Sequence, residues 1–272
     1  MSTEDKTYRT QQGEIRYWIA HQGHDAPWLV FLPGLTADHT LFDAQMAHFK
    51  GKANCLTWDA PAHGLSRPYP LGFSLDDCAE ALHGILEAEG AARPVLVGQS
   101  FGGYVAQAYL ALYPGEASGF VSIDSSPLQR RLYEGWELWT LKHAEGMFRC
   151  IPWNALVKWS ADGNALTQAG RGNMREMMLA YGKREYCALV GHSYRIAADA
   201  ILADRPYAAD CPVLLLCGEK DATGYVKRYC REWSRSLGAP LVWVPDAAHN
   251  SNVDNPEFVN AQIERFAGRI GL

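Results

Sequence analysis

The sequence predicts an α/β protein: a mostly parallel, doubly wound sheet with a helical cap inserted into it. Short apolar runs alternate with helical patterns along most of the chain, which is typical of parallel strands covered by helices on both faces. A Gly-x-Ser-x-Gly segment joins one such run to the helical pattern after it. Residues 127–205 interrupt the alternation with helical segments and glycine turns, and they contain no convincing buried strand.

The composition is that of an ordinary soluble globular protein. Of the 272 residues, 48% are hydrophobic and 20% are charged, and the formal net charge is -5. The length allows one large domain or a core with a smaller accessory unit. Because no basic tract is present, a nucleic-acid partner is not expected.

The N-terminal segment and the cysteines predict a cytoplasmic location. Residues 1–12 are polar and lack the apolar core of a signal peptide. No apolar run approaches the ~20 residues that a helix needs to span a bilayer, so no membrane partner is expected. The seven cysteines are scattered, odd in number and without Cys-x-x-Cys spacing, which favours reduced thiols.

The predicted elements begin with a hairpin formed by the runs 7–10 and 14–20. Residues 74–89 form a helical pattern in which Ser74 and Asp77 have the spacing of a capping box. The other predicted strands are residues 28–32, 53–58, 94–97, 120–123, 213–217 and 241–244.

Two domains are expected. Residues 1–126 and 206–272 form the core, and residues 127–205 form a helical cap inserted after the sixth strand. The cap holds four of the nine tryptophans and four of the six methionines. Aromatic and methionine residues of this kind fit plain packing or a substrate pocket. Because an inserted cap covers part of the core, the interpretation as a substrate pocket becomes more favourable relative to plain packing.

Ser100 lies at the centre of the Gly-x-Ser-x-Gly segment, between the apolar run 95–97 and the helical pattern 104–112. A serine on so tight a strand-to-helix turn leaves no room for side chains two residues before and after it, which explains Gly98 and Gly102. The turn exposes the hydroxyl to a substrate. An incidental serine in a glycine-rich loop is the alternative.

A serine hydroxyl needs a histidine to accept its proton and a carboxylate to orient that histidine. Catalytic groups of parallel α/β sheets collect at the carboxyl ends of strands. Asp221 follows the predicted strand 213–217, and His249 follows the strand 241–244. Asp124, at the end of the strand 120–123, is a possible alternative acid. Taken singly, each of these residues also fits a solvated or turn-capping role.

The order and spacing of these residues resemble the α/β-hydrolase fold superfamily over nearly the whole chain. Membership implies Ser100 as nucleophile, Asp221 as acid and His249 as base. It also implies an oxyanion hole made by the backbone N–H groups of Leu35 and Phe101. Some relatives place the acid at the end of the preceding strand, as Asp124 would.

Two segments depart from the family pattern. Many relatives carry His-Gly where this chain has Pro33 and Gly34, in the loop that holds Leu35. Residues 59–66 resemble the turn Asp-x-Pro-Gly-His-Gly-x-Ser, with Ala62 in place of a glycine. A tight turn explains this segment structurally. Its His63, and also His39, are candidates for the edge of a pocket.

The predicted function is hydrolysis of a carboxylic ester with a small to medium, partly apolar acyl or aryl group. Relatives with the same residues cleave carbon–carbon bonds, lactones or amides, and these reactions stay open, as does a receptor of the same fold without turnover. A small-molecule substrate is the expected partner, and the oligomeric state is open.

Four cap arginines are either solvated or placed to meet a substrate carboxylate: Arg130, Arg131, Arg171 and Arg175.

Neither a metal nor a cofactor is expected. His21 and His24 lie close together in the sequence, but no cysteine or carboxylate constellation surrounds them. The chain contains no Gly-x-Gly-x-x-Gly segment and no phosphate-binding lysine loop. The expected chemistry therefore depends on side chains and water.

Overall fold

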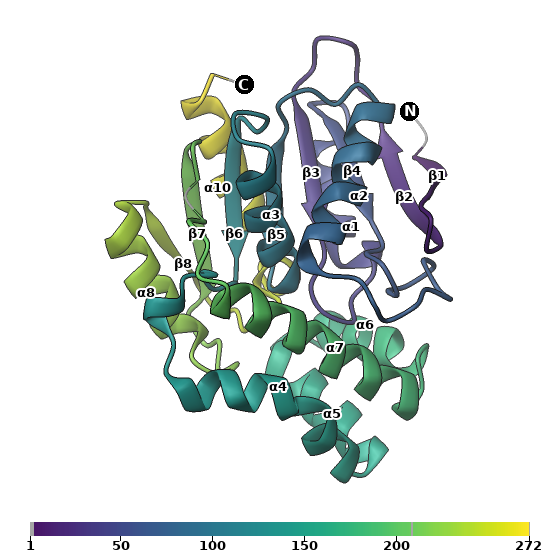
Figure 1. Ribbon diagram of the computed structural model, residues 1–272. Coiled ribbons are helices and arrows are strands. Elements are labelled where there is room, and N and C mark those ends of the chain that lie inside the picture. The colour runs from purple at the N-terminus through teal and green to yellow at the C-terminus, as the bar shows by residue number, and fades with distance from the viewer. Residues whose placement is uncertain (1–2, 208, 272) are drawn as a thin grey trace.

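A computed structural model describes residues 3–207 and 209–271 of the chain. The strands form one sheet in the order β1-β2-β4-β3-β5-β6-β7-β8 (Figure 1). The pairs β1–β2 and β2–β4 are antiparallel, and all later pairs are parallel. The strands are β1 (Glu4–Arg9), β2 (Glu14–Ala20), β3 (Trp28–Leu32), β4 (Asn54–Trp58), β5 (Val95–Gln99), β6 (Gly119–Ile123), β7 (Val213–Gly218) and β8 (Leu241–Val244).

Helices follow most of the strands. In Figure 1, α2 and α3 lie in front of the sheet and α10 lies behind it. The longer helices are α1 (Asp43–Phe49), α2 (Leu75–Ala88), α3 (Phe101–Leu112), α4 (Gly135–Cys150), α5 (Trp153–Asn164), α6 (Gln168–Leu179), α7 (Lys183–Leu202), α8 (Val226–Leu237) and α10 (Pro256–Arg269). The shorter ones are α9 (Ser251–Asp254) and the 3₁₀ helices η1 (His39–Phe42) and η2 (Arg130–Leu132).

The predicted α/β class with a mostly parallel sheet is confirmed. Every residue of β3, β4, β5 and β6 is buried, which explains their continuous apolar runs. The opening hairpin also forms, although β1 begins at Glu4 rather than at residue 7. At the start of α2 the Ser74 hydroxyl accepts a hydrogen bond from the Asp77 N–H at 3.1 Å, and Asp77 accepts one from the Ser74 N–H at 2.6 Å. The expected capping box is therefore present.

Between β6 and β7 the chain forms η2, α4, α5, α6 and α7, and the residues described in this stretch contain no strand. We call the four helices α4 to α7 the helical layer. They lie together at one end of the sheet (Figure 1). Its methionines Met174, Met177 and Met178 are buried, whereas Trp136 and Trp159 are more than half exposed. The tryptophans of this segment therefore do not share one buried role, and the division into two domains stays a prediction.

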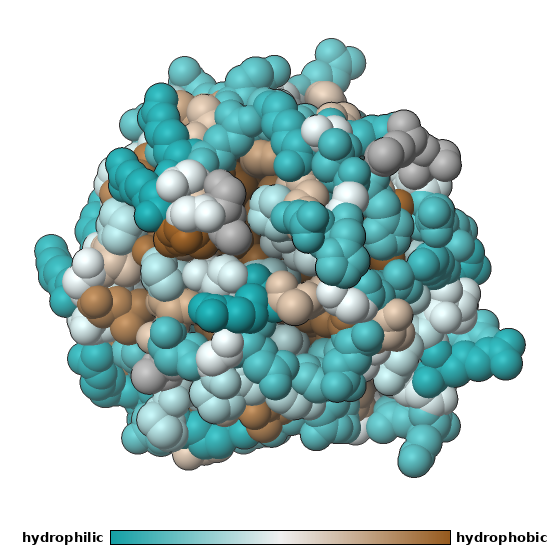
Figure 2. All heavy atoms as spheres, turned by 90° about the horizontal axis from the view of Figure 1, so that it is seen from above, coloured by the Kyte–Doolittle hydropathy of each residue, from teal (hydrophilic) through white to brown (hydrophobic). Residues whose placement is uncertain are grey.

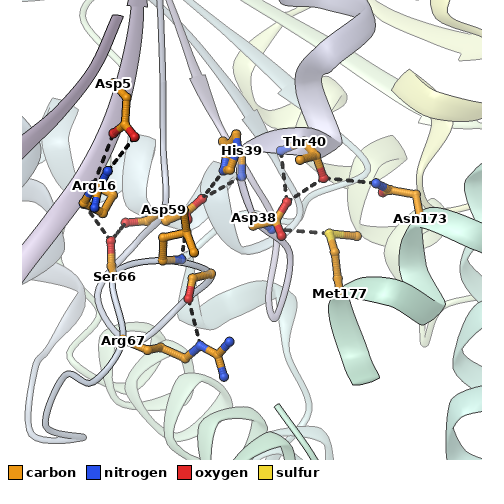
Figure 3. Close-up of polar contacts among 12 residues, drawn as sticks. Asp5, Arg16, Asp38, His39, Thr40, Asp59, Ser66, Arg67, Asn173 and Met177 are labelled. Carbon is orange, nitrogen blue, oxygen red and sulfur yellow. Dashed lines mark hydrogen bonds and ion pairs between the residues drawn. The ribbon is translucent and has the colours of Figure 1, made fainter. Parts of the chain in front are cut away.

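The helix α6 contacts the loop after β3 through a small polar network (Figure 3). The Asn173 side-chain amide donates to the Thr40 hydroxyl at 3.1 Å, and the Met177 sulfur accepts from the Asp38 N–H at 3.4 Å. The Asp38 carboxylate in turn accepts from the Thr40 N–H at 3.0 Å. These contacts fix one edge of the helical layer to the core.

The face of the molecule opposite the helical layer is mostly hydrophilic, and its hydrophobic areas are small and separated (Figure 2). None of the helices in the described part of the chain is long and apolar enough to cross a membrane.

Candidate active site

Ser100 occupies a strained turn between β5 and α3, with φ 49° and ψ -113°. The two flanking glycines are required by close approach. A Cβ at Gly98 would lie 2.6 Å from the Gly102 carbonyl carbon, and a Cβ at Gly102 would lie 1.9 Å from the Leu32 oxygen. Larger residues at these positions would force the backbone apart. The serine is thus held at the end of the strand, as the sequence predicts.

Ser100, His249 and Asp221 form one chain of hydrogen bonds. His249, on the loop after β8, has its Nε2 atom 2.9 Å from the Ser100 Oγ atom. Its Nδ1 atom lies 2.8 Å from Asp221 Oδ2, on the loop after β7. Because an ionised carboxylate only accepts hydrogen bonds, Nδ1 carries the proton and Nε2 is free to accept from the serine hydroxyl.

The electrostatics of this pair favour an ion pair over two neutral groups. Burial by itself lowers the pKa of His249, but the charges of Asp221 and Asp124 outweigh it and raise that pKa above its usual value. Burial likewise opposes ionisation of Asp221, and His249 together with the Thr223 N–H brings its pKa below the usual range. A protonated imidazole is therefore stabilised at this position.

Asp124 lies beside this pair but does not hydrogen-bond to the imidazole. One carboxylate oxygen accepts from the Gly218 N–H at 2.7 Å, and the other accepts from the Ser251 N–H at 3.0 Å. Asp124 thus bridges the loops that carry Asp221 and His249. Burial and the Asp221 charge raise the pKa of Asp124 to about 7. The geometry places Asp221, and not Asp124, on the histidine.

Gln99 is a functional neighbour that the sequence does not reveal. Its side-chain amide donates to the His249 carbonyl oxygen at 2.8 Å, and its side-chain oxygen would lie 2.1 Å from a Cβ at Gly34. It therefore joins the loop of Leu35, the serine turn and the histidine loop. No sequence signal indicates a contact between residues so far apart in the chain.

Leu35 and Phe101, the predicted oxyanion-hole residues, both line the cavity that contains Ser100. Phe101 is the first residue of α3, where a backbone N–H has no partner within its own helix. Neither the Leu35 N–H nor the Phe101 N–H donates a hydrogen bond to another group within residues 3–207 and 209–271. Both donors are thus available to a ligand.

Ser100 and His249 open into a cavity of about 460 Å³, a size typical of small-molecule sites. The sheet edge forms one wall and the helical layer forms the opposite wall. Residues of the helical layer in this wall include Trp136, Glu137, Thr140, Leu141, Phe148, Ser160, Met174, Tyr186, Val190 and Tyr194.

His39 and His63, the two candidates for the edge of a pocket, do not line the cavity. His39 stacks on Trp18 with ring centroids 3.5 Å apart, and its Nδ1 atom lies 3.0 Å from the buried Asp59 carboxylate (Figure 3). His63 is fully buried against the Phe101 ring, and burial lowers its pKa to about 4. Both histidines belong to the packing behind the site, which fits the structural interpretation of residues 59–66.

The four cap arginines also lie outside the cavity wall. Arg130 donates to the Tyr133 carbonyl oxygen, and Arg131 donates to the Gln129 side chain at 3.0 Å. Arg171 donates to the Ala165 carbonyl oxygen at 3.0 Å. Arg175 lies 3.9 Å from the Asp162 carboxylate. Of the two alternatives for these cations, the structure therefore favours solvated charges over contacts with a substrate carboxylate.

Asp124, Cys217 and Asp221 place potential metal-ligand atoms within 4.8 Å of one another. All three residues are buried, and both carboxylates already accept hydrogen bonds from backbone N–H groups. Asp221 also holds His249. The two carboxylates of this donor set are thus already used in hydrogen bonds within the protein.

Comparisons with known proteins agree with this architecture. The model of the alpha/beta hydrolase family matches residues 29–262. The 2-(acetamidomethylene)succinate hydrolase of Mesorhizobium japonicum is 24% identical, over 95% of this chain and 94% of its own length. The 2-succinyl-6-hydroxy-2,4-cyclohexadiene-1-carboxylate synthase of Serratia proteamaculans is 25% identical, over 91% of this chain and 96% of its own.

Solved structures show the same fold. An esterase from Thermogutta terrifontis superposes with a TM-score of 0.77 at 20% identity, and the match covers 100% of both chains. The enol-lactonase from Burkholderia xenovorans LB400 superposes with a TM-score of 0.80 at 19% identity, covering 97% of this chain and 100% of that one. At these identities the likeness concerns the fold alone.

Proposed function

Because the chain belongs to the alpha/beta hydrolase family, we propose that it is a serine hydrolase that cleaves carboxylic esters through an acyl-enzyme. The observation that carries the proposal is the chain of hydrogen bonds from Ser100 to His249 to Asp221, at 2.9 and 2.8 Å. It ends at a serine in the wall of a cavity of small-molecule size. Nucleophile, base and orienting carboxylate are the three groups that acyl transfer to a serine needs.

In the first half of the reaction, the Ser100 oxygen attacks the ester carbonyl carbon while its proton moves to His249 Nε2. The carbonyl oxygen becomes an oxyanion, which the N–H groups of Leu35 and Phe101 stabilise. One such donor contributes about 3 kcal/mol in a well-studied serine protease. The intermediate then breaks the bond to the leaving alcohol, which takes the proton from His249.

In the second half, water attacks the acyl-enzyme. His249 accepts a proton from the water and returns one to Ser100 as the acid leaves. The imidazolium that forms in both halves lies against the Asp221 carboxylate, which holds the ring in the tautomer that accepts at Nε2. Asp221 thus acts as the orienting acid.

A fluorophosphonate probe tests this proposal, because it phosphonylates only an activated serine. We expect rapid stoichiometric labelling of the wild-type protein and none of the Ser100→Ala variant at the same concentration. Ser160→Ala is the matched control, since Ser160 lines the same cavity from α5 without a hydrogen bond to Ser100 or His249, and it should label at the wild-type rate.

A series of p-nitrophenyl esters of increasing acyl length measures the reaction itself. Activity should fall once the acyl group exceeds the space of the cavity. A wild-type protein that is folded, does not label and does not cleave any ester of the series would contradict the proposal. If its melting temperature still rises with small ligands, a receptor without turnover is the better account.

A further inference from the structure

Two carboxylates, one on each wall, border the cavity that contains Ser100. Asp124 lies at the sheet edge and accepts two backbone hydrogen bonds. Glu137 lies on α4, where one oxygen accepts from the Glu134 N–H at 2.7 Å and the other accepts from Arg228 at 2.6 Å. Asp124 is fully buried and Glu137 is 5% exposed. Above its pKa of about 7, Asp124 therefore places a negative charge on one side of the space that a substrate enters, and Glu137 places an ion-paired carboxylate on the other side.

Arg228, the cation that pairs with Glu137, does not itself line the cavity. Its guanidinium group lies over the rings of Tyr225 and Tyr229, at 4.7 and 4.6 Å from their centroids. Its Nε atom has no hydrogen-bond partner among the described residues. A substrate carboxylate that drew the guanidinium group away from Glu137 would leave that carboxylate buried without its partner, and an unpaired buried charge is strongly destabilising.

The rest of the wall is aromatic and hydroxylic. The Tyr104 hydroxyl lies 2.7 Å from the Ser126 hydroxyl, and the Tyr133 hydroxyl donates to the Pro127 carbonyl oxygen at 2.8 Å. Such groups accept or donate single hydrogen bonds but do not neutralise a charge. Among the described residues of the wall, none is a lysine or an arginine. Six tyrosines contribute to it: Tyr104, Tyr133, Tyr186, Tyr194, Tyr225 and Tyr229.

Resting on the proposed hydrolase function, we infer that this site selects acyl compounds without a carboxylate or another negative charge. A carboxylate entering the cavity loses its water shell and finds no lysine or arginine in the described wall in exchange. Near the sheet edge it is also repelled by the ionised Asp124. An uncharged acyl or aryl group avoids both costs and packs on the tyrosine rings and on Leu141, Val190 and Met174.

Three esters of one alcohol separate charge from size. We compare 1-naphthyl butyrate, 1-naphthyl hemisuccinate and 1-naphthyl methyl succinate at pH 8, where the hemisuccinate is ionised, after subtracting spontaneous hydrolysis. The two uncharged esters should show kcat/KM at least about 100-fold above that of the hemisuccinate. A hemisuccinate that is cleaved as fast as the methyl succinate, or faster, overturns the inference and leaves the proposed function intact.

A binding measurement keeps the inference testable if no ester is cleaved. The two compounds 4-phenylbutyramide and 4-phenylbutyrate have nearly the same shape, but the amide is uncharged and the carboxylate is an anion. Calorimetry on the wild-type protein gives the two Kd values. We expect the amide to bind at least about 10-fold more tightly. Equal or tighter binding of the carboxylate overturns the inference, whatever the result of the fluorophosphonate experiment.

A designed cation sharpens the same point. Leu141 lies in the helical wall and is partly exposed, so the ammonium group of Leu141→Lys can remain hydrated. This variant should raise kcat/KM for the hemisuccinate at least about 10-fold relative to the methyl succinate. Leu141→Met, of similar length and without charge, should leave that ratio unchanged. If the folded Leu141→Lys variant shows the wild-type ratio of kcat/KM for the hemisuccinate to that for the methyl succinate, the electrostatic account is contradicted.

Discussion

The two walls of the cavity are built on different principles. At the sheet edge, Ser100 and Asp124 have positive φ angles, and Gly98, Gly102 and Gly34 have no space for a Cβ. In the helical layer, Gly146 and the cavity-lining Gly163 have nothing within 4 Å of a Cβ position, whereas a Cβ at Gly191 would lie 2.3 Å from the Glu145 Cβ. The backbone of the first wall is therefore closely packed, whereas the second wall has room for larger side chains at its surface.

This difference assigns different tasks to the two walls. Reaction chemistry needs exact distances between groups, and the strand ends supply them because each residue is fixed by the ladder behind it. Substrate selection needs a surface of suitable shape and charge, which side chains on helices supply. We therefore expect changes at the sheet edge to lower kcat, and changes in the helical layer to alter which substrates are used.

The largest expected effect tests the two carboxylates of the sheet edge against each other. Asp221→Asn should lower kcat by about 10⁴-fold, because the amide favours the wrong tautomer of His249. Asp124→Asn keeps the hydrogen bond that the His249 Nδ1–H donates to Asp221, and it should lower kcat by less than about 100-fold. Steady-state kinetics with circular dichroism as the folding control give both numbers. If Asp124→Asn lowers kcat more than Asp221→Asn does, Asp124 is the catalytic acid instead.

The second test concerns the backbone of the two walls. Gly102→Ala would place a Cβ 1.9 Å from the Leu32 oxygen, and we expect a loss of about 3 kcal/mol or more in the free energy of unfolding, since such strain is among the few causes of large effects. Gly146→Ala, inside α4 with open space around it, should add about 0.5–1 kcal/mol. Urea titration measures both. Equal effects would remove the contrast between the walls.

Sequence reasoning worked best at the sheet edge, where function follows from local order. Ser100 is predicted by its two glycines, and Asp221 and His249 are predicted by their places directly after strands. The structure brings these three side chains together. The identity of the strands also follows from the sequence, because full burial produces unbroken apolar runs.

The contacts that support this site cannot be predicted from the sequence. Gln99 reaches the His249 carbonyl oxygen, and Asp124 joins two loops, through pairings that exist only after folding. His39 stays a candidate for the pocket edge at the level of the sequence, because nothing there shows that its ring stacks on Trp18 and hydrogen-bonds to Asp59. In the helical layer, periodicity does not reveal which tryptophans are exposed.

A smaller effect is expected where the two walls are joined. The Asp254 carboxylate accepts from the Leu166 and Thr167 N–H groups of the helical layer and from the Ala248 N–H beside His249, at 2.9 to 3.0 Å. Asp254→Asn turns one acceptor into a donor that faces an N–H, and should lower the free energy of unfolding by about 1–3 kcal/mol.

Asp199→Asn is the control for this joint, because Asp199 forms an exposed ion pair with Lys142 within the helical layer. Exposed pairs contribute little, so its effect should stay below about 1 kcal/mol. If the walls are as independent as their construction implies, kcat of Asp254→Asn falls less than about 10-fold. A loss of kcat comparable to that of Asp221→Asn would show instead that the helical layer holds the histidine in place.

The smallest effect is a shift in pH dependence confined to the sheet edge. His249 must be unprotonated to accept the Ser100 proton, so kcat/KM should rise with pH through an inflection above 6.5, because Asp221 and Asp124 raise the pKa of His249. Asp124→Asn removes a negative charge that favours the imidazolium in the wild-type protein. The pKa of His249 should therefore fall, and the inflection should move to lower pH by about one unit or less. Asp246→Asn, an exposed residue on the histidine loop, should leave it unchanged because water screens that charge. Equal shifts in the two variants would mean that net charge, and not the buried carboxylate beside the imidazole, sets the profile.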